Sequence, residues 1–145
     1  MIRSKRMQPV VALAKDREHK AAGELGESRQ RLSEHQQRLE ELYRYRDDYI
    51  KGMNSAGAAG LDAARMRDYR LFLERLDLAI KQQQQVVSEG SGHVTEKSAQ
   101  WVETRTKSKM MDKVVGRIRN EEDAKARRQE QKLLDEQAQR RRRLD

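Results

Sequence analysis

Apolar residues in the first third of the chain recur with the 3-4 spacing of a coiled coil. Leu25, Leu32 and Leu39 are seven residues apart. The full set of core positions in this frame is Val11, Ala14, Glu18, Ala21, Leu25, Ser28, Leu32, His35, Leu39, Leu42, Arg46 and Tyr49. Because such a stripe lies on one face of a helix, it predicts a helix over residues 9–51 that packs against a single partner helix. Pro9 suits the first turn, where its missing N–H costs nothing.

A second periodic segment follows a cluster of small residues. Residues 52–60 read GMNSAGAAG, and three glycines among small residues are typical of a helix end and a chain reversal. Beyond them one heptad frame runs through Tyr69, Phe72, Leu76, Ala79, Gln83 and Val86, and it resumes at Met111, Val114 and Ile118. We therefore predict a second helix over residues 61–138 and a basic tail to residue 145. Gly90 and Gly92 each cost about 1 kcal/mol in a helix, so a break is easiest there.

These elements predict an all-α fold, in which two long helices form an antiparallel coiled-coil hairpin as a single domain. If the chain reverses near residue 56, Leu25 faces Val86 and Val87, and Val11 faces Trp101. The pairing then ends near residue 111. About 35 residues of the second helix extend beyond it, which is roughly 50 Å at 1.5 Å per residue.

The composition supports thin helical packing and argues against a globular core. Charged residues make up 39% of the chain and hydrophobic residues 35%, with a single proline and no cysteine. Too few apolar side chains are present to offset the entropy of ordering a thick core. The missing cysteines exclude disulfides and thiolate metal sites, and no apolar run reaches the roughly 20 residues of a membrane span. Lys15 and Asp16 end the N-terminal apolar patch too early for a secretion signal.

The sequence contains no constellation typical of an enzyme. His19, His35 and His93 are far apart, and none has a second metal ligand at a suitable spacing. The glycines at 57 and 60 lack the Lys-Ser/Thr of a phosphate-binding loop. A two-helix rod also has no deep pocket in which to desolvate an acid. We therefore expect a binding protein without catalytic activity, cofactor or metal.

Most of the positive charge lies in the last 41 residues. The chain has a net charge of +8, and residues 105–145 hold 14 Lys or Arg against 8 acids. Arg140–Arg143 could simply complement the helix dipole, or they could bind an acidic protein pore, a nucleic acid or an anionic membrane. Because acids such as Glu121 and Glu130 alternate with the cations and no stacking aromatics accompany them, a protein partner is favoured over a nucleic acid.

One segment, residues 69–80, has more apolar side chains than a single seam can bury. Phe72, Leu76 and Ala79 share one helix face, while Leu73 and Ile80 share another. Either both sets pack near the turn against the tyrosines at 43, 45 and 49, or one set is an exposed stripe for a partner.

Three stretches in this order resemble the FliJ family, the coiled-coil component of the bacterial flagellar type III export apparatus. They are MQPVVALAKDRE, YRLFLERLDLAIKQQQ and EEDAKARRQEQKLLDEQAQRR, and the likeness in length and layout covers nearly the whole chain. The resemblance implies a non-enzymatic stalk, similar to the central stalk of rotary ATPases. Its expected partners are the hexameric flagellar export ATPase, the cytoplasmic domain of the export gate protein, and the export chaperones that it escorts.

The resemblance also implies binding residues and a location. The positions that match the gate-binding cluster are Phe72, Leu76 and Ala79, and the next heptad step is the more polar Gln83. Candidates for contact with the ATPase ring are Lys113, Arg117, Arg128, Gln131, Lys132 and Asp135. The expected location is the cytoplasm, at the inner membrane beside the flagellar basal body, with attachment through partners only.

Two other hypotheses fit the residues without the resemblance. A basic coiled coil could bind nucleic acid, which predicts steeply salt-dependent binding. A structural rod could instead self-associate, with the Leu25–Leu39 seam joining two molecules. Sedimentation separates that dimer from a monomer, and residues 52–60 favour reversal within one chain because a continuous rod has no use for them.

Overall fold

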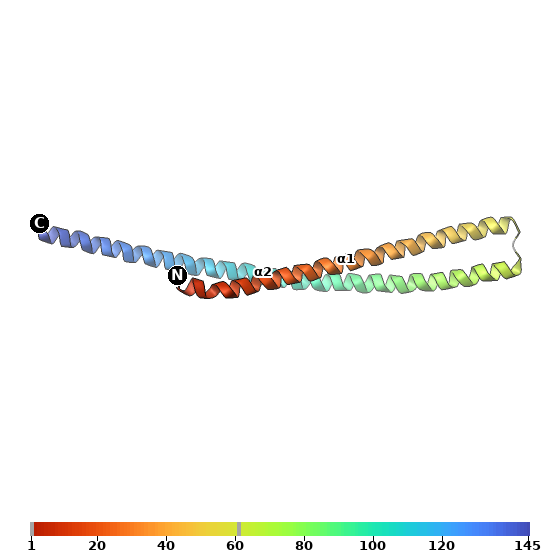
Figure 1. Cartoon of the computed structure of the whole chain (residues 1–145), viewed down its shortest axis with the longest axis horizontal. Coiled ribbons are helices and arrows are strands. Elements are labelled where there is room, and N and C mark those ends of the chain that lie inside the picture. Colours follow the sequence, from red (N-terminus) through yellow and green to blue (C-terminus); the bar gives the residue numbers. More distant parts are fainter. Residues whose placement is uncertain (1, 61) are drawn as a thin grey trace. The chain divides into compact units, whose positions relative to one another are not determined.

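In a computed structural model of the chain, residues 2–60 and 62–145 are described, and they contain two long helices and no strand (Figure 1). Helix α1 spans Ile2–Ala58 and helix α2 spans Ala63–Leu144. The predicted all-α class with two long helices is confirmed. Both helices are longer than the sequence patterns indicated, because polar residues with good helix propensity extend them beyond the apolar stripe.

The reversal of the chain is shorter than predicted. Residues 52–58 are helical, and Gly60 adopts a φ of 89°, a left-handed conformation that glycine tolerates best. The Gly60 N–H donates to the Gly57 carbonyl at 3.2 Å, which closes the end of α1. Asp62 then caps α2, since its Oδ1 accepts from the Arg65 N–H at 2.9 Å. Leu61, the predicted first residue of the second helix, lies outside the described residues.

Pro9 and two glycines could each interrupt a helix, but all three lie inside one. Pro9 was expected at the first turn, but it lies inside α1 at an exposed position. Gly90 and Gly92 do not interrupt α2, which continues through both. Tertiary packing on either side supplies more stability than two glycines remove, so the helix persists.

The described part of the chain divides into two compact units. Unit 1 contains residues 2–21 and 101–145, and unit 2 contains residues 22–100. Within each unit, a segment of α1 packs antiparallel against a segment of α2. A two-helix seam buries residues only against neighbouring turns, so no common core gathers the whole chain.

Unit 1 is held by contacts between the beginning of α1 and the middle of α2. The Ser4 Oγ donates to Glu122 at 2.8 Å, and the Ser4 backbone N–H donates to the same carboxylate at 3.0 Å. Lys15 and Asp112 are 4.0 Å apart. The buried side chains of this unit are Ser4, Ala21, Ser108, Val115 and Ile118.

Unit 2 contains the turn and the rest of the seam. Leu25, Leu76 and Ile80 are each less than 8% exposed. Gln83 donates from Nε2 to the His35 carbonyl at 2.9 Å, and Lys97 lies 3.4 Å from Glu24. Leucines of α1 are thus covered by α2 of the same chain, as a hairpin requires.

The pairing register differs from the one calculated for a reversal near residue 56. Lys97, not Val87, lies opposite the residues around Leu25, and Val11 lines one groove with Val115, far from Trp101. Moving the reversal by about five residues shifts the facing register by about ten, which is nearly three helical turns. The correction shortens the unpaired end of α2 as well.

Candidate functional site

Four aromatic rings cluster beside the turn of unit 2. Tyr45 and Tyr49 come from α1, and Tyr69 and Phe72 come from α2. The ring of Phe72 lies 4.3 Å from that of Tyr49 and 5.9 Å from that of Tyr45, measured between centroids. Tyr69 lies 5.1 Å from Tyr49. Partial burial, with the Tyr69 hydroxyl as the next cause, raises the pKa of Tyr49. This aromatic cluster joins the two helices.

The three residues expected to bind the export gate occupy different environments. Leu76 is only 7% exposed and belongs to the seam, whereas Phe72 and Ala79 are half-buried. Gln83, the next heptad step, donates a hydrogen bond from its side-chain amide to the His35 carbonyl. The structure therefore presents Phe72 and Ala79 to a partner far more than it presents Leu76.

Other apolar side chains of the same region are more accessible. Tyr45, Leu71 and Leu78 are 53%, 48% and 58% exposed. Leu71 and Leu78 are one heptad apart, so they share the outer face of α2. Reading the sequence by seam positions missed them, because an outward-facing leucine carries no periodic signal of its own. The near-turn surface, defined here as Tyr45, Leu71, Phe72, Leu78 and Ala79, is the main apolar candidate for partner binding.

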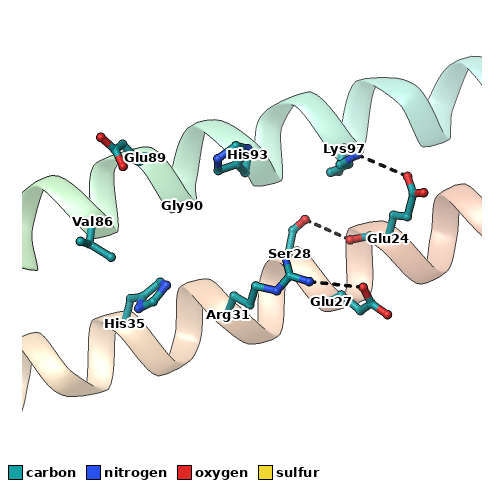
Figure 2. A pocket seen from close by; sticks show the side chains of 10 residues that line it. All are labelled: Glu24, Glu27, Ser28, Arg31, His35, Val86, Glu89, Gly90, His93 and Lys97. Carbon is teal, nitrogen blue, oxygen red and sulfur yellow. Dashed lines mark hydrogen bonds and ion pairs between the residues drawn. The ribbon is translucent and has the colours of Figure 1, made fainter.

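A groove of about 410 Å³ lies between the helices at the end of unit 2 that is remote from the turn (Figure 2). Its lining residues are Glu24, Glu27, Ser28, Arg31, His35, Val86, Glu89, Gly90, His93 and Lys97. Gly90 is one of the lining residues, and its lack of a side chain lets Leu32 of α1 pack closely against α2. A Cβ at this position would lie 3.3 Å from Leu32 Cδ1, so Leu32 occupies the space that the glycine leaves.

The charges of this groove largely satisfy one another. Lys97 pairs with Glu24, Arg31 lies 3.6 Å from Glu27, and the Ser28 hydroxyl donates to the Glu24 carbonyl at 3.0 Å. The Nδ1 atom of His35 is buried and has no hydrogen-bond partner among the described residues. No three His, Asp or Glu side chains in the described part of the chain gather closely enough to hold a metal ion. The arrangement offers an open gap in the seam whose charged residues pair with one another.

The second candidate surface is the C-terminal part of α2 in unit 1. Since Ser4 meets Glu122, the residues beyond about 124 have no part of α1 opposite them, which is roughly 30 Å of single helix. All side chains from Lys125 to Asp145 are exposed. This unpaired end includes the Arg140–Arg143 run and is shorter than the 35 residues expected from the sequence.

The six residues expected to contact the ATPase ring divide between two environments. Arg128, Gln131, Lys132 and Asp135 lie on the unpaired end, and the Gln131 amide donates to Asp135 at 3.2 Å. Lys113 and Arg117 are exposed as well, but they lie on the part of α2 that pairs with α1. The structure thus brings four of the six candidates together on one unsupported helix.

The face of α2 that forms the seam changes character where α1 ends. Up to Ile118 and Glu122 the seam positions are buried or half-buried. Continued in the same 3-4 frame, they become Lys125, Gln129, Lys132, Glu136, Gln139 and Arg143. A stripe without apolar residues cannot form a second coiled coil of the same kind, so this face of the unpaired end is suited to polar contacts.

Comparison with known proteins places this architecture among flagellar proteins. Residues 4–144 match the protein family described as flagellar FliJ protein. A flagellar FliJ protein of Escherichia coli (strain K12) is 28% identical over 128 residues, which covers 88% of this chain and 87% of that relative. No solved structure matches the chain.

Proposed function

The chain belongs to the flagellar FliJ family, and from this membership we propose that it forms the stalk of the flagellar export ATPase ring. A family member is a component of flagellar protein export. The finer proposal is that the chain has no catalytic activity, enters the hexameric ring and links it to the export gate. The observation that carries it is the unpaired, fully exposed end of α2.

A single helix inside a ring is contacted on its whole circumference, because ring subunits surround it. The unpaired end offers exposed side chains all round: its seam positions are polar, and its other faces carry Arg128, Asp135 and the Arg140–Arg143 run. Its exposed Leu133 and Leu134, at 61% and 53%, offer apolar contacts that would be costly to leave in water. Family membership and this geometry together support insertion into a ring.

ATP hydrolysis by the cognate export ATPase tests the stalk proposal. The full chain is expected to stimulate hydrolysis and ring assembly, whereas a chain ending at residue 124 is expected to stimulate neither. The double substitution Arg128→Glu with Lys132→Glu reverses two charges on the unpaired end and is expected to weaken stimulation about tenfold or more. Arg29→Glu with Lys81→Glu is the matched control, because it reverses two exposed charges in unit 2. A folded full chain that leaves hydrolysis unchanged would refute the proposal.

We further propose that the near-turn surface binds the cytoplasmic domain of the export gate protein. Its support is the gathering of exposed apolar groups, since monomeric proteins rarely leave such patches without a use. Leu78→Ala is the cleanest test, because Leu78 is 58% exposed, more than any other residue of the near-turn surface, and its loss should disturb the seam least. We expect this variant to weaken gate binding at least fivefold in calorimetry. Val102→Ala, which removes a 52% exposed residue in unit 1, should bind normally.

Escort of export chaperones and location at the inner membrane complete the proposal. Neither described helix contains an apolar stretch that could cross a lipid bilayer. We therefore propose that partners hold the chain at the cytoplasmic side of the membrane. Co-purification of export chaperones with the tagged chain, and its release from membranes when the gate protein is deleted, are the expected results. Retention on membranes without the gate and the ATPase would contradict attachment through partners.

A further inference from the structure

One flank of unit 1 carries cations and apolar residues in a regular order along α1. It consists of three pairs, one heptad apart: Arg3 and Arg6, then Val10 and Leu13, then Arg17 and Lys20. All six residues are exposed, with Val10 at 45% and Leu13 at 50%. We call these six residues the basic flank. Its four cations form no ion pair with any described residue, and they are Arg3, Arg6, Arg17 and Lys20.

The pairing within unit 1 shows which side of the seam the basic flank occupies. Lys15 of α1 and Asp112 of α2 line the same groove, with Gln8, Val11, Ala12, Val115, Gly116 and Arg119. That groove marks one side of the two-helix seam. Lys15 and Asp112 each directly follow a core position in their helix. The residues that directly precede a core position therefore lie on the opposite side of the seam, and these are Val10 and Arg17 on α1 and Val114 on α2.

Helix α2 adds apolar surface to the same side. Val114 is half-buried, and Met110, half a heptad away, is 60% exposed. Exposed Val10, Leu13 and Met110 thus leave an apolar centre between two cationic pairs. The next pair along α1 is Glu24 and Glu27, so the run of cations stops at Lys20. The basic flank is roughly 26 Å long, which corresponds to about five helical turns.

We propose that the basic flank binds an acidic amphipathic helix of a protein partner. The complementary helix would carry two apolar residues against Val10 and Leu13, with carboxylates one heptad before and after them. Apolar contact at the centre would supply most of the affinity, because exposed ion pairs contribute little individually. The four cations would set orientation and speed of association through charge complementarity.

Two other anionic ligands fit the flank less well. A helix that lies in a membrane interface needs a broad apolar face, usually with Trp or Phe, but residues 2–21 contain no Trp, Phe or Tyr and the flank has two aliphatic side chains. A nucleic acid favours an unbroken row of cations with stacking aromatics, whereas here an apolar pair interrupts the row. The order of charges favours a protein helix.

This inference goes beyond the stalk proposal and does not depend on it. The basic flank lies on the paired part of unit 1, whereas the proposed ring contact centres on the unpaired end beyond residue 124. A chain ending at residue 124 should lose stimulation of the ATPase and keep binding at the flank. Failure of one proposal can therefore be distinguished from failure of the other.

The test uses the full chain and a labelled helical peptide of about 18 residues, read out by fluorescence anisotropy. The peptide carries a Glu pair, a Leu pair and a Glu pair, one heptad apart, and comparison peptides replace Glu by Lys or Leu by Ser. We expect the acidic Leu peptide to bind, the Lys peptide not to bind, and affinity to fall as salt is added. Arg17→Glu should weaken binding about tenfold, and Val10→Ser with Leu13→Ser should do the same.

Matched controls isolate the flank from general charge and hydrophobicity. Lys5→Glu reverses an exposed cation of α1 outside the flank, and Val102→Ser removes an exposed apolar residue of α2 outside it. Both should bind the peptide as the unsubstituted chain does, and circular dichroism should show equal helicity in all variants. Equal weakening by Arg17→Glu and Lys5→Glu would overturn the proposal, as would absence of peptide binding. Arg17-dependent binding of phosphatidylglycerol vesicles or duplex DNA without peptide binding would overturn it too.

Discussion

The rings of Tyr49 and Phe72 lie 4.3 Å apart between centroids, at an interplanar angle of 36°. Tyr49 belongs to α1 and Phe72 to α2, so this contact fastens the two helices beside their turn. Phe72 therefore has two roles to separate, because it stabilises unit 2 and also contributes to the near-turn surface. Loss of gate binding in a Phe72 variant has meaning only when its stability is measured beside it.

Phe72→Ala is expected to lower the free energy of unfolding by about 2–3 kcal/mol. The substitution removes ring contacts with both Tyr45 and Tyr49 and exposes part of the seam. Urea unfolding followed by circular dichroism measures the change. Leu71→Ala is the control, since Leu71 is 48% exposed and should cost about 0.5 kcal/mol or less. Equal losses from the two variants would show that the aromatic contacts contribute nothing.

A pair of leucines on α2 tests the seam itself. Leu76 is 7% exposed and Leu78 is 58% exposed, although they are two residues apart in the same helix. Leu76→Ala should cost about 2–4 kcal/mol through lost burial and an unfilled cavity, and Leu78→Ala should cost about 0.5 kcal/mol. Thermal and urea unfolding of both variants check the difference. The reverse order would mean that the opposite face of α2 forms the seam.

Gly90 and Gly92 provide a matched comparison of packing and helix propensity. A Cβ at Gly92 would meet nothing within 4 Å, so Gly92→Ala should raise the unfolding free energy by about 0.8 kcal/mol. At Gly90 the new methyl would press on Leu32 at 3.3 Å, which should cancel most of that gain. Urea unfolding compares the two variants. An equal gain in unfolding free energy at both positions would show that Leu32 does not pack against Gly90.

Gly57 and Gly60 separate the end of α1 from the turn. Gly60 has a φ of 89°, a conformation in which a Cβ is strained, so Gly60→Ala should destabilise unit 2 by about 1 kcal/mol. Gly57 is helical and a Cβ there would have open space, so Gly57→Ala should stabilise it by a similar amount. Thermal unfolding gives the sign of each change. If both substitutions stabilised the protein, Gly60 could not be the residue at which the chain reverses.

Sequence periodicity predicted the seam of α1 well. Every predicted core position from Val11 to Tyr49 is buried or half-buried, including the polar Glu18, Ser28 and His35. The 3-4 spacing suffices because helix geometry alone brings these residues onto one face. On α2 the periodicity did not decide which face is buried, because the Phe72–Ala79 and Leu73–Ile80 stripes are both apolar. The structure buries Leu76 and Ile80, while Phe72 and Ala79 remain accessible at the edge.

The candidate surfaces could be predicted only in part. Charge counting found the basic C-terminal end, because clustering of arginines is visible without coordinates. Its length was overestimated, and the exposed Leu71 and Leu78 were missed, because both depend on which residues face each other. The basic flank was missed for the same reason: its cations and apolar residues become one surface only after the seam fixes the side of α1 that faces water.

By itself, the sequence determined that this chain is helical, that each helix has one thin apolar stripe, and that the reversal lies in the glycine-rich segment. Local propensity and heptad spacing carry that information. The tertiary structure decided which glycine turns the chain, which turns of α1 and α2 meet, and where pairing stops at Ser4 and Glu122. Several glycines in this segment could adopt the turn conformation at almost equal cost. The position of the turn is therefore set by the total energy of the seam, which is a sum over contacts between residues far apart in the chain.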